Sequence, residues 1–324
     1  MAIISWRFIG LAMKRSVAFL AFCAACLPVL AAADIYTLPE NGDNIIGSVQ
    51  KIAAVYEDTF TRLARRYNLG YSELQQANPE VDPWLPGTGT AITLPKFYVL
   101  PDAPREGIVI NLAEMRLYYY PPATAGGNPT VETYPIGIGR DAFPTPELIS
   151  EIKARIPQPA WYPPESIIAE HAAKGEILPR TVPPGPNNPL GDYAIQLTAP
   201  GYFIHGTNRA GGIGLRVSHG CIRMYPEDIE ALFNKVSIGT PVRVVHQPVK
   251  VGILGGQVYI EAHPSTQSEV DSIGWLVTSQ LAQMVGEQSV AMDWERVEEA
   301  AAAQNGIPVP VALVTPAHLA TANR

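Results

Sequence analysis

Short apolar and β-branched runs alternate with turn residues through the middle of the chain. Three stretches each predict a pair of strands: IVINLAEMRLYYYPP (108–122), VETYPIGIGR (131–140) and GDYAIQLTAPGYFIHGTN (191–208). Their β-branched and aromatic residues flank turn-forming positions, which is the usual composition of strands joined by turns. GTPVRVVHQPV (239–249) predicts a further strand. The pattern therefore predicts a mainly β domain, which we place at residues 105–246.

One helix is clearly predicted within this domain, at residues 226–236 (PEDIEALFNKV). Pro226 suits its first turn, acidic residues lie near its start, and Lys235 lies near its end, as the helix dipole favours. The helix follows closely on Cys221, the only cysteine beyond residue 26.

Residues 36–96 predict a small α+β unit that precedes the main domain. Its first helix has apolar residues at helical spacing, and Thr59 is a candidate N-cap: Phe60, Leu63, Ala64 and Tyr67. A second helix should run from about Ser72 to Asn78, and TAITLP (90–95) closes the unit as a strand.

The C-terminal extension, residues 247–324, predicts a mostly helical tail. SEVDSIGWLVTSQLAQMV (268–285) and DWERVEEAAAAQ (293–304) have helical patterns, whereas GIPVPVALVTP (306–316) should be extended. We expect these segments to pack on the main domain, and the sequence assigns them no function.

The first 33 residues have the pattern of a secretory signal peptide. Lys14 and Arg15 form a basic segment, an apolar stretch runs from about 17 to 30, and the small residues that follow fit cleavage after Ala33. Such a segment implies that the mature chain is exported to an oxidising compartment.

Two other interpretations of this segment fit less well. An uncleaved anchor would need a longer apolar run than the one present, so we expect no stable membrane span. Lipidation at Cys23 or Cys26 is disfavoured, because Phe22 stands where a small residue should precede Cys23. The start itself could be Met1 or Met13, since Met13 directly precedes the basic pair.

Charge and cysteine content narrow the function. The full chain has a net charge of −7, and the charged residues in segment 1–33 are all basic. An acidic chain without basic blocks is a poor ligand for nucleic acid, so we expect no nucleic-acid partner. After cleavage Cys221 is the only cysteine, which leaves an unpaired thiol in an oxidising compartment. A small buried hydrophobe is the plain alternative, but export and the nearby His219 favour a nucleophile.

A thiol needs a base or a positive neighbour to become reactive. His219 lies two residues before Cys221, and His205 would face it if the glycine-rich segment 211–214 turns back. Gly220 would allow backbone N–H groups to converge on an oxyanion. Arg223 is a candidate for two-pronged binding of a substrate carboxylate.

Two alternatives for these residues stay open at this stage. His205, His219 and Cys221 could supply three ligands of a catalytic zinc, although two of them are only two residues apart and no other cluster completes the set. His205 could also be an ordinary buried histidine. We expect no metal and no cofactor.

At these residues the chain resembles a known family. IHGTNRAGGIGLRVSHGCIRMYPEDIEALF (204–233) is similar to the signature of the L,D-transpeptidase (YkuD) family, in the order H-G-T-N, I-G and S-H-G-C-I-R-M. EGIVINLAEMRLYYYP, LPRTVPPGPNNPLGDYAIQL and IGTPVRVV resemble the periplasmic branch of Gram-negative bacteria. The resemblance covers roughly residues 36–265, and it implies a YkuD-type β-sandwich for the catalytic domain.

The resemblance also implies an activity. The family attacks the amide after the L-centre of meso-diaminopimelate in a tetrapeptide stem of peptidoglycan, releases D-alanine, and passes the acyl group to an amine. Its members cross-link peptidoglycan or attach a Braun-type lipoprotein to it. A thioester keeps the energy of the cleaved amide, so the reaction needs no ATP. We find no nucleotide motif in the sequence.

Site roles follow from the same resemblance. Cys221 would be the nucleophile, and His205 the general base and acid, oriented by a backbone carbonyl near Gly206. The remaining residues would line the oxyanion hole, shape the donor site or bind substrate: His219, Gly220, Ser218, Arg223 and Asn208. FPTPELIS (143–150) stands where many members have T-P-x-G, which leaves the form of the loop over the donor site open.

The unit at 36–96 resembles a LysM module, a strand–helix–helix–strand domain that binds glycans containing N-acetylglucosamine. DTFTRLARRYNL, ELQQANP and ITLP carry the likeness, although Glu57 replaces the glycine of the usual G-D-T. The alternative is a two-helix spacer that packs on the next domain and binds nothing.

Three functions remain open from sequence. The chain could be a transpeptidase, a cysteine hydrolase of the same linkages with water as acceptor, or a wall-binding protein without catalysis. Motifs do not separate transfer from hydrolysis, because the acceptor depends on pocket shape. Nor do they distinguish a lipoprotein lysine from a second diaminopimelate.

Overall fold

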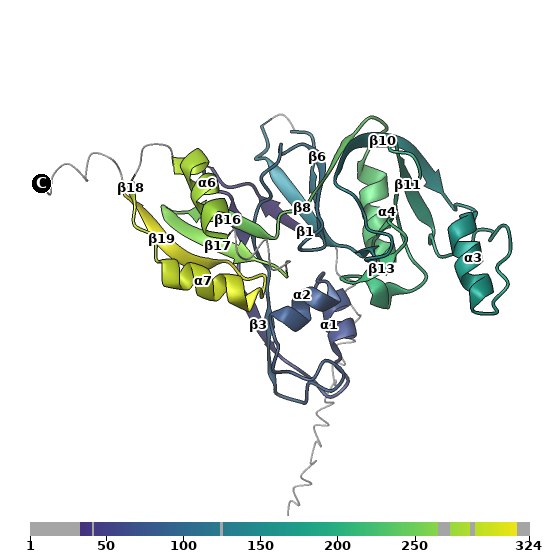
Figure 1. Cartoon of the computed structure of the whole chain (residues 1–324), viewed down its shortest axis with the longest axis horizontal. Coiled ribbons are helices and arrows are strands. Elements are labelled where there is room, and N and C mark those ends of the chain that lie inside the picture. Colours follow the sequence, from purple (N-terminus) through teal and green to yellow (C-terminus); the bar gives the residue numbers. More distant parts are fainter. Residues whose placement is uncertain (1–32, 41, 124–125, 265–272, 286–288, 316–324) are drawn as a thin grey trace, which may run out of the picture.

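The computed structural model describes residues 33–40, 42–123, 126–264, 273–285 and 289–315. Figure 1 shows a central curled sheet with helix α4, a two-helix unit below it, and a second sheet with its own helices at the left. The predicted signal segment lies almost wholly outside the described residues. No helix in the described part of the chain is long and apolar enough to cross a bilayer.

Nine strands form the central sheet, in the order β1-β8-β7-β6-β15-β10-β11-β12-β14. Most neighbours are antiparallel, whereas β15–β6 and β12–β14 are parallel. The strands are β1 (Asp34–Thr37), β6 (Gly107–Asn111), β7 (Arg116–Tyr120), β8 (Thr130–Pro135), β10 (Leu148–Pro157), β11 (Tyr193–Leu197), β12 (Phe203–His205), β14 (Ile222–Arg223) and β15 (Pro241–Val245). The predicted strand pairs are thus confirmed, and the domain is mainly β.

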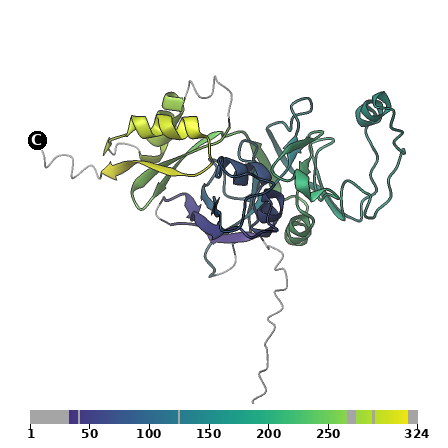
Figure 2. The ribbon, with the colours of Figure 1, turned by 90° about the horizontal axis from the view of Figure 1, so that it is seen from below.

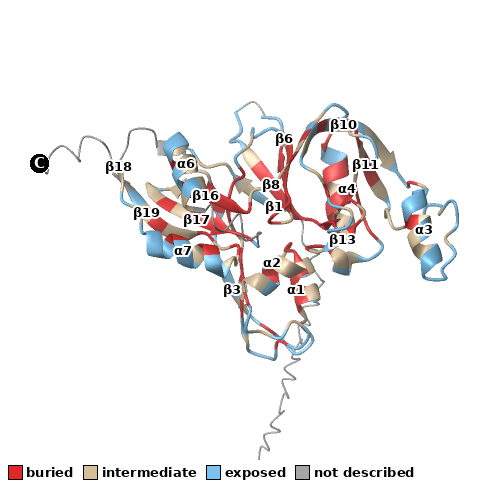
Figure 3. Cartoon of the chain, in the orientation of Figure 1, coloured by how far each residue is buried: buried red, intermediate tan, exposed pale blue. Residues whose placement is uncertain are grey.

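The core of this domain lies between the sheet and α4 (Pro226–Lys235). Proline occupies the first turn of α4, as predicted, and the helix buries Ile229, Leu232 and Phe233 against apolar residues of the sheet. Figure 3 shows buried segments along the strands of the central sheet and on α4. Because α4 begins three residues after β14, its packing fixes the end of the strand that follows Cys221.

The two-helix unit consists of β3 (Gln50–Ala53), α1 (Phe60–Arg66), α2 (Tyr71–Gln76) and β4 (Ala91–Leu94), with β3 and β4 antiparallel. The Thr59 hydroxyl accepts from the backbone N–H of Arg62, which confirms the predicted cap. Two strands that precede this unit in the chain pair with strands outside it. β1 joins the central sheet through β8, and β2 (Ile45–Gly47) pairs with β5 (Phe97–Val99).

The C-terminal extension is a second sheet rather than a helical tail alone. Both predicted helices are present, α6 (Ile273–Val285) and α7 (Trp294–Ala303), and residues 309–315 are extended as β19 (Val309–Thr315). The pattern did not predict that they build a sheet with β16 (Val249–Leu254), β17 (Gln257–Ala262) and β18 (Ser289–Val290). The sheet and helices share a core of their own, so this part is a folded layer.

A long excursion between β10 and β11 carries α3 (Glu165–Ala173). Figure 2 shows this arm extending away from the rest of the molecule. Only Ile167 is buried in α3, so burial of apolar surface contributes little to holding the arm in place. Two shorter strands, β9 (Ile138–Gly139) and β13 (Arg216–Ser218), pair in parallel, and β13 leads into the cysteine motif.

Candidate active site

The parallel pairing of β12 and β14 brings the two ends of the glycine-rich segment together. Ile204 lies opposite Ile222 and His205 opposite Arg223. Since both isoleucines are buried in the core, strand alternation places His205 and Arg223 on the other face of the sheet. Cys221 is one residue before β14 and lies on that same face. The sheet, rather than the glycines alone, therefore brings the thiol and the imidazole to one surface.

His205 is held as a neutral imidazole with a defined tautomer. Its Nδ1 lies 2.6 Å from the Gly206 carbonyl oxygen, which can only accept, so Nδ1 carries the proton and Nε2 is the unprotonated nitrogen of the neutral ring. Burial lowers the pKa of His205 to about 4, and the positive charge of Arg223 adds to that effect. At neutral pH the ring is thus able to take up a proton at Nε2.

Cys221 is half-buried, and its thiol is protonated at rest. Burial raises the pKa of this thiol above its usual value, while a hydrogen bond from the backbone of Phe203 and the charge of Arg223 act in the opposite direction. The sulfur lies 3.7 Å from the Gly201 carbonyl oxygen. The pair therefore rests as neutral thiol and neutral imidazole rather than as a thiolate–imidazolium ion pair.

The turn before the cysteine is fixed by hydroxyl groups. Ser218 Oγ accepts from the Gly220 N–H at 3.1 Å and donates to the Cys221 carbonyl oxygen at 2.5 Å. Gly220 has φ +97°, a left-handed conformation that favours glycine. The N–H of Gly220 is already used, which leaves the N–H of Cys221 as the backbone donor at this turn.

Thr145 anchors the loop that faces this turn. Its hydroxyl donates to the Gly220 carbonyl oxygen at 2.9 Å and accepts from the N–H of Gly139 at 2.9 Å. The loop 143–150 lacks the glycine of the T-P-x-G pattern, but its threonine ties it to the cysteine turn. The sequence pattern pointed to this loop but did not single out Thr145.

Arg223 lies near the thiol, and its guanidinium has no protein partner among the described residues. Its Nε is buried, and no hydrogen bond to it is present among the described residues. Its charge acts on both Cys221 and His205. Asn208 follows β12 and is exposed, with its amide directed to no partner in the described part of the chain. A half-buried guanidinium beside a thiol, with no partner among the described residues, is suited to an anionic group of a substrate.

His219 points to a different set of partners. Its Nε2 lies 3.0 Å from Glu170 Oε2 and 2.9 Å from Arg140 Nη2. Arg140 also pairs with Glu170 through both nitrogens of its fork, and Lys174 contacts the same carboxylate. Arg140 first, then Lys174 and His219, hold the pKa of Glu170 well below its usual range. The carboxylate is thus ionised and fixes the orientation of the His219 ring.

Arg140 and Glu170 were missed by sequence reasoning. Glu170 lies on α3, 49 residues before His219, so no local pattern links the two. Arg140 was visible as the end of GIGR, and its backbone N–H donates to the Ser218 carbonyl oxygen at 3.0 Å. The Phe143 ring packs on His219 with 4.7 Å between centroids. The arm carrying α3 thus contacts the cysteine motif through a charged cluster.

The one group of potential metal ligands among the described residues lies elsewhere, at Glu114, Glu261 and His263. Lys250 already occupies the position of a cation there, with its Nζ 2.9 Å from Glu114 Oε2 and 2.8 Å from Glu261 Oε1. Both carboxylates are fully buried. The cluster joins the C-terminal extension to the central sheet and is a structural ion network. His205, His219 and Cys221 do not gather as the zinc alternative requires, since His219 is committed to Glu170 and Arg140.

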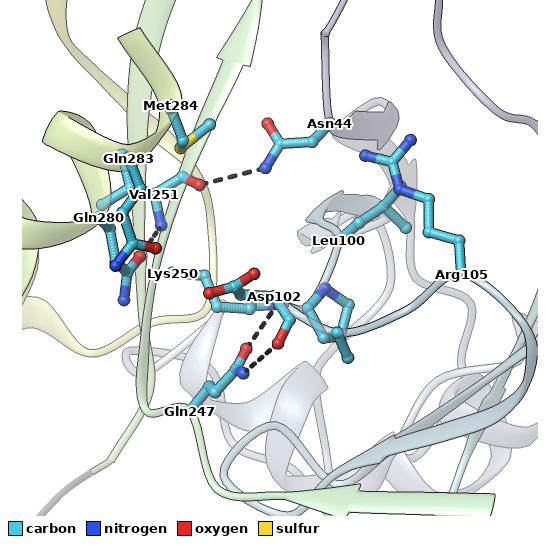
Figure 4. A pocket seen from close by; sticks show the side chains of 12 residues that line it. Asn44, Leu100, Asp102, Arg105, Gln247, Lys250, Val251, Gln280, Gln283 and Met284 are labelled. Atoms are coloured by element: carbon cyan, nitrogen blue, oxygen red, sulfur yellow. Dashed lines mark hydrogen bonds between the residues drawn. The ribbon is translucent and has the colours of Figure 1, made fainter. Parts of the chain in front are cut away.

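A cavity of about 340 Å³ lies at the same junction. Figure 4 shows it between α6 and β16 on one side and Asn44 and the segment 100–105 on the other. Its amides mostly hold neighbouring segments together: Gln247 pairs with the backbone of Asp102, and Gln280 accepts from the N–H of Val251. Neither Cys221 nor His205 lines this cavity.

Comparisons with known proteins agree with the geometry. Residues 105–244 match the family model of the L,D-transpeptidase catalytic domain, YkuD. The probable L,D-transpeptidase YcfS of Escherichia coli is 40% identical over 309 residues, which are 92% of this chain and 95% of that protein. The probable L,D-transpeptidase YbiS of the same organism is 40% identical over 302 residues, or 90% and 95% of the two chains. The probable L,D-transpeptidase ErfK/SrfK of Salmonella typhimurium is 38% identical over 314 residues, or 94% and 99%.

Proposed function

The chain belongs to the L,D-transpeptidase (YkuD) family, and from this premise we propose how its own residues carry out the reaction. It is an acyltransferase that acts on peptidoglycan. We assign it the tetrapeptide stem as donor, with Cys221 as nucleophile and His205 as general base and acid. The observation that carries the assignment is the shared face of β12 and β14, with the Nδ1–H of His205 bound to the Gly206 carbonyl and Nε2 unprotonated.

The first half-reaction forms a thioester. His205 Nε2 takes the proton of the Cys221 thiol as the sulfur attacks the amide carbonyl on the L-centre of diaminopimelate. The N–H of Cys221 donates to the oxyanion that develops, and Ser218 and Gly220 hold the turn that aims this N–H. When the tetrahedral intermediate collapses, the C–N bond breaks and His205 returns the proton to the amine of the leaving D-alanine.

The second half-reaction transfers the acyl group. An acceptor amine gives its proton to His205 while it attacks the thioester carbonyl, and the Cys221 sulfur leaves and regains that proton. The low resting pKa of His205 matters here, because Arg223 is one of its causes. A substrate carboxylate bound to Arg223 would offset that positive charge and raise the basicity of the imidazole. Binding of the donor would thereby prepare the base for the proton transfer.

Around this pair, we assign Arg223 and Asn208 to substrate binding and His219 to shaping the site. Arg223 has the unpaired guanidinium described above. Asn208 follows His205 by three residues and is exposed beside it. His219 is the residue through which the arm of α3 meets the site. Further, we place the catalytic domain at 105–246 and the C-terminal extension at 247–324.

For the two-helix unit at 36–96 we propose glycan binding. Exposed apolar side chains occur on two loops of this unit, Tyr56 before α1 and Trp84 with Leu85 after α2, with 79%, 69% and 67% of their surfaces accessible. The N–H of Phe60 donates to the Pro83 carbonyl oxygen at 2.8 Å, which holds the two loops together. Exposed aromatic rings on adjoining loops suit the apolar faces of sugars, as in a LysM module.

We further propose that residues 1–33 direct export and are removed, so that the enzyme acts in the periplasm. The basic pair, the apolar stretch and the small residues before Asp34 support this proposal. Peptidoglycan stems and glycan strands are then the partners, and a Braun-type lipoprotein is one candidate acceptor.

Mass spectrometry of muropeptides tests the proposed reaction. Wild-type protein with tetrapeptide stems should release D-alanine and form a product joined to the added amine. Cys221→Ala should retain the thermal melt of the wild type and lose both products, because no other thiol is present in residues 34–324. Transfer by Cys221→Ala would refute the nucleophile assignment. Release of D-alanine with only free acid as product would show hydrolysis instead of transfer.

A further inference from the structure

The start of α2 in the two-helix unit is bound directly to the loop that leads to the cysteine motif. The N–H of Tyr71 donates to the Ile213 carbonyl oxygen at 3.1 Å, and the N–H of Ser72 lies 3.4 Å from the Gly214 carbonyl oxygen. These two donors belong to the first turn of a helix, where backbone N–H groups have no partner within the helix. The loop therefore provides acceptors for these two N–H groups, while Glu73 Oε2 accepts from the N–H of Gly70, the N-cap residue.

Two glycines make this contact unusually close. A Cβ on Gly70 would lie 2.9 Å from the Gly214 Cα, and a Cβ on Gly214 would lie 2.3 Å from the Tyr71 nitrogen. Gly214 also has φ +79°, which favours glycine on its own account. Backbones thus touch backbones at this point, so the relative position of α2 and the loop is defined without intervening flexible side chains.

Hydrogen bonds connect this contact point of the loop with the segment that carries the thiol. The N–H of Gly214 donates to the Ile136 carbonyl oxygen, and the N–H of Ile138 donates to that of Leu215, which starts the pairing of β13 with β9. β13 ends at Ser218, whose hydroxyl binds the backbone of both Gly220 and Cys221. A continuous path of backbone contacts, completed by the Ser218 hydroxyl, therefore runs from α2 to Cys221.

The unit is also fixed to the catalytic domain around this point. Arg116 of β7 is fully buried and pairs with Glu73 of α2, with 2.6 Å between Nη2 and Oε2. The Tyr225 hydroxyl donates to the Leu69 carbonyl oxygen at 3.2 Å. Buried charges of this kind hold one geometry, because separating them leaves an unpaired ion away from water.

We propose that the two-helix unit positions the catalytic loop, with Gly70 and Gly214 as the positioning contact, in addition to the glycan binding proposed for its outer loops. This inference rests on the proposed role of Cys221. The unit is then part of the active-site scaffold, and a shift of α2 against the loop is transmitted to the turn at Ser218–Cys221. A misplacement of about 1 Å at a nucleophile is enough to cost on the order of 10²-fold in rate.

A pair of alanine substitutions in the full-length chain tests the contact. Gly70→Ala forces α2 and the loop apart. Gly211→Ala is the matched control, because it lies on the same loop and its Cβ would meet only a Thr61 methyl at 3.8 Å. Two readouts are compared at a temperature well below both melts. One is kcat and KM for a soluble tetrapeptide stem, and the other is the rate of Cys221 alkylation by iodoacetamide.

We expect Gly70→Ala to lower kcat by about tenfold or more, with little change in KM, and to alter the alkylation rate. Gly211→Ala should match the wild type in both. Equal values for the two variants would overturn the proposal. If Gly70→Ala does not fold, Tyr225→Phe serves as the test variant instead, since it removes only the hydroxyl that donates to the Leu69 carbonyl oxygen. A several-fold loss of kcat with an altered alkylation rate supports the proposal, and wild-type values overturn it.

The alkylation readout separates this inference from the proposed reaction. If the wild type shows no transfer at all, the proposed function fails, yet the thiol still reports on the geometry of its turn. In that case a difference in alkylation between Gly70→Ala and Gly211→Ala supports a positioning contact, and no difference refutes it.

Discussion

Replacing His205 with glutamine should make the folded chain less sensitive to acid. The imidazole is 4% exposed, and burial together with Arg223 lowers its pKa to about 4 from the ordinary value of 6.5. Because the folded-state pKa is depressed, the neutral ring stabilises the fold fully above the unfolded pKa. That stabilisation is lost as pH falls from 6.5 toward 4.

The size of the effect follows from those two values. Between pH 7 and about pH 4.5, linkage predicts that His205 alone removes about 2 kcal/mol from the free energy of unfolding. His205→Gln keeps an amide that can donate to the Gly206 carbonyl but does not titrate. The variant should therefore lose about 2 kcal/mol less than the wild type over this range. Other groups that titrate here are common to both proteins and cancel in the difference.

Urea unfolding followed by tryptophan fluorescence at the two pH values measures this difference. His171→Gln is the control for loss of a histidine, because His171 lies on the exposed arm and contacts Glu176. His263 is unsuitable, since it is buried against Glu261. Parallel losses in the wild type and His205→Gln would refute the reasoning. They would mean that the folded chain tolerates an imidazolium, as a thiolate–imidazolium pair requires.

Four further outcomes are expected. Glu170→Gln should lower kcat several-fold by freeing the His219 ring, whereas Lys174→Gln, at the C-cap of the same helix, should not. Equal kcat values for the two variants would refute a role for the carboxylate. Thr145→Val should destabilise the chain by about 1–3 kcal/mol and slow transfer, because it leaves two buried backbone groups without a partner. Thr145→Ser should restore the stability in urea unfolding and the transfer rate in kinetic assays. Trp84→Ala should weaken sedimentation with sacculi while leaving turnover of a soluble stem unchanged; unaltered sedimentation would contradict glycan binding. EDTA should leave transfer intact whereas iodoacetamide abolishes it, and recovery by added zinc after chelation would favour a metal site.

The elements that sequence predicted correctly are those whose signal is local. The strands at 107–120 are rich in β-branched and aromatic residues and flank their own turn, and the helix at 226–235 has its proline, acids and lysine in place within one segment. The proposed nucleophile and its histidine, Cys221 and His205, could be singled out because both lie within one stretch that resembles a family signature. Their proximity depends on the parallel pairing of β12 with β14, which the sequence pattern does not reveal.

What the sequence did not predict depends on distant partners. α3 is short and mostly exposed, so its pattern carries little amphipathic signal, and its link to the site is an ion cluster with His219. The strands β16 and β17 form a hairpin across Gly255 and Gly256, a local signal that the sequence analysis did not use. Their sheet is extended by β19, which pairs with β17 from about 50 residues later in the chain. The fit of Gly70 against Gly214 is likewise a contact between two backbones that neither segment shows alone.

The buried ion network beneath the C-terminal extension limits how this chain can be cut or exchanged in evolution and engineering. Glu114 sits in the turn after β6 of the catalytic domain, but the ammonium that neutralises it comes from Lys250 on β16. A catalytic domain that ends near residue 246 would keep the carboxylate and lose its counter-ion, leaving a charge where water is scarce. Such a minimal enzyme needs Glu114 replaced by a neutral residue at the same time. For the same reason, natural loss of the extension should go together with loss of the acid.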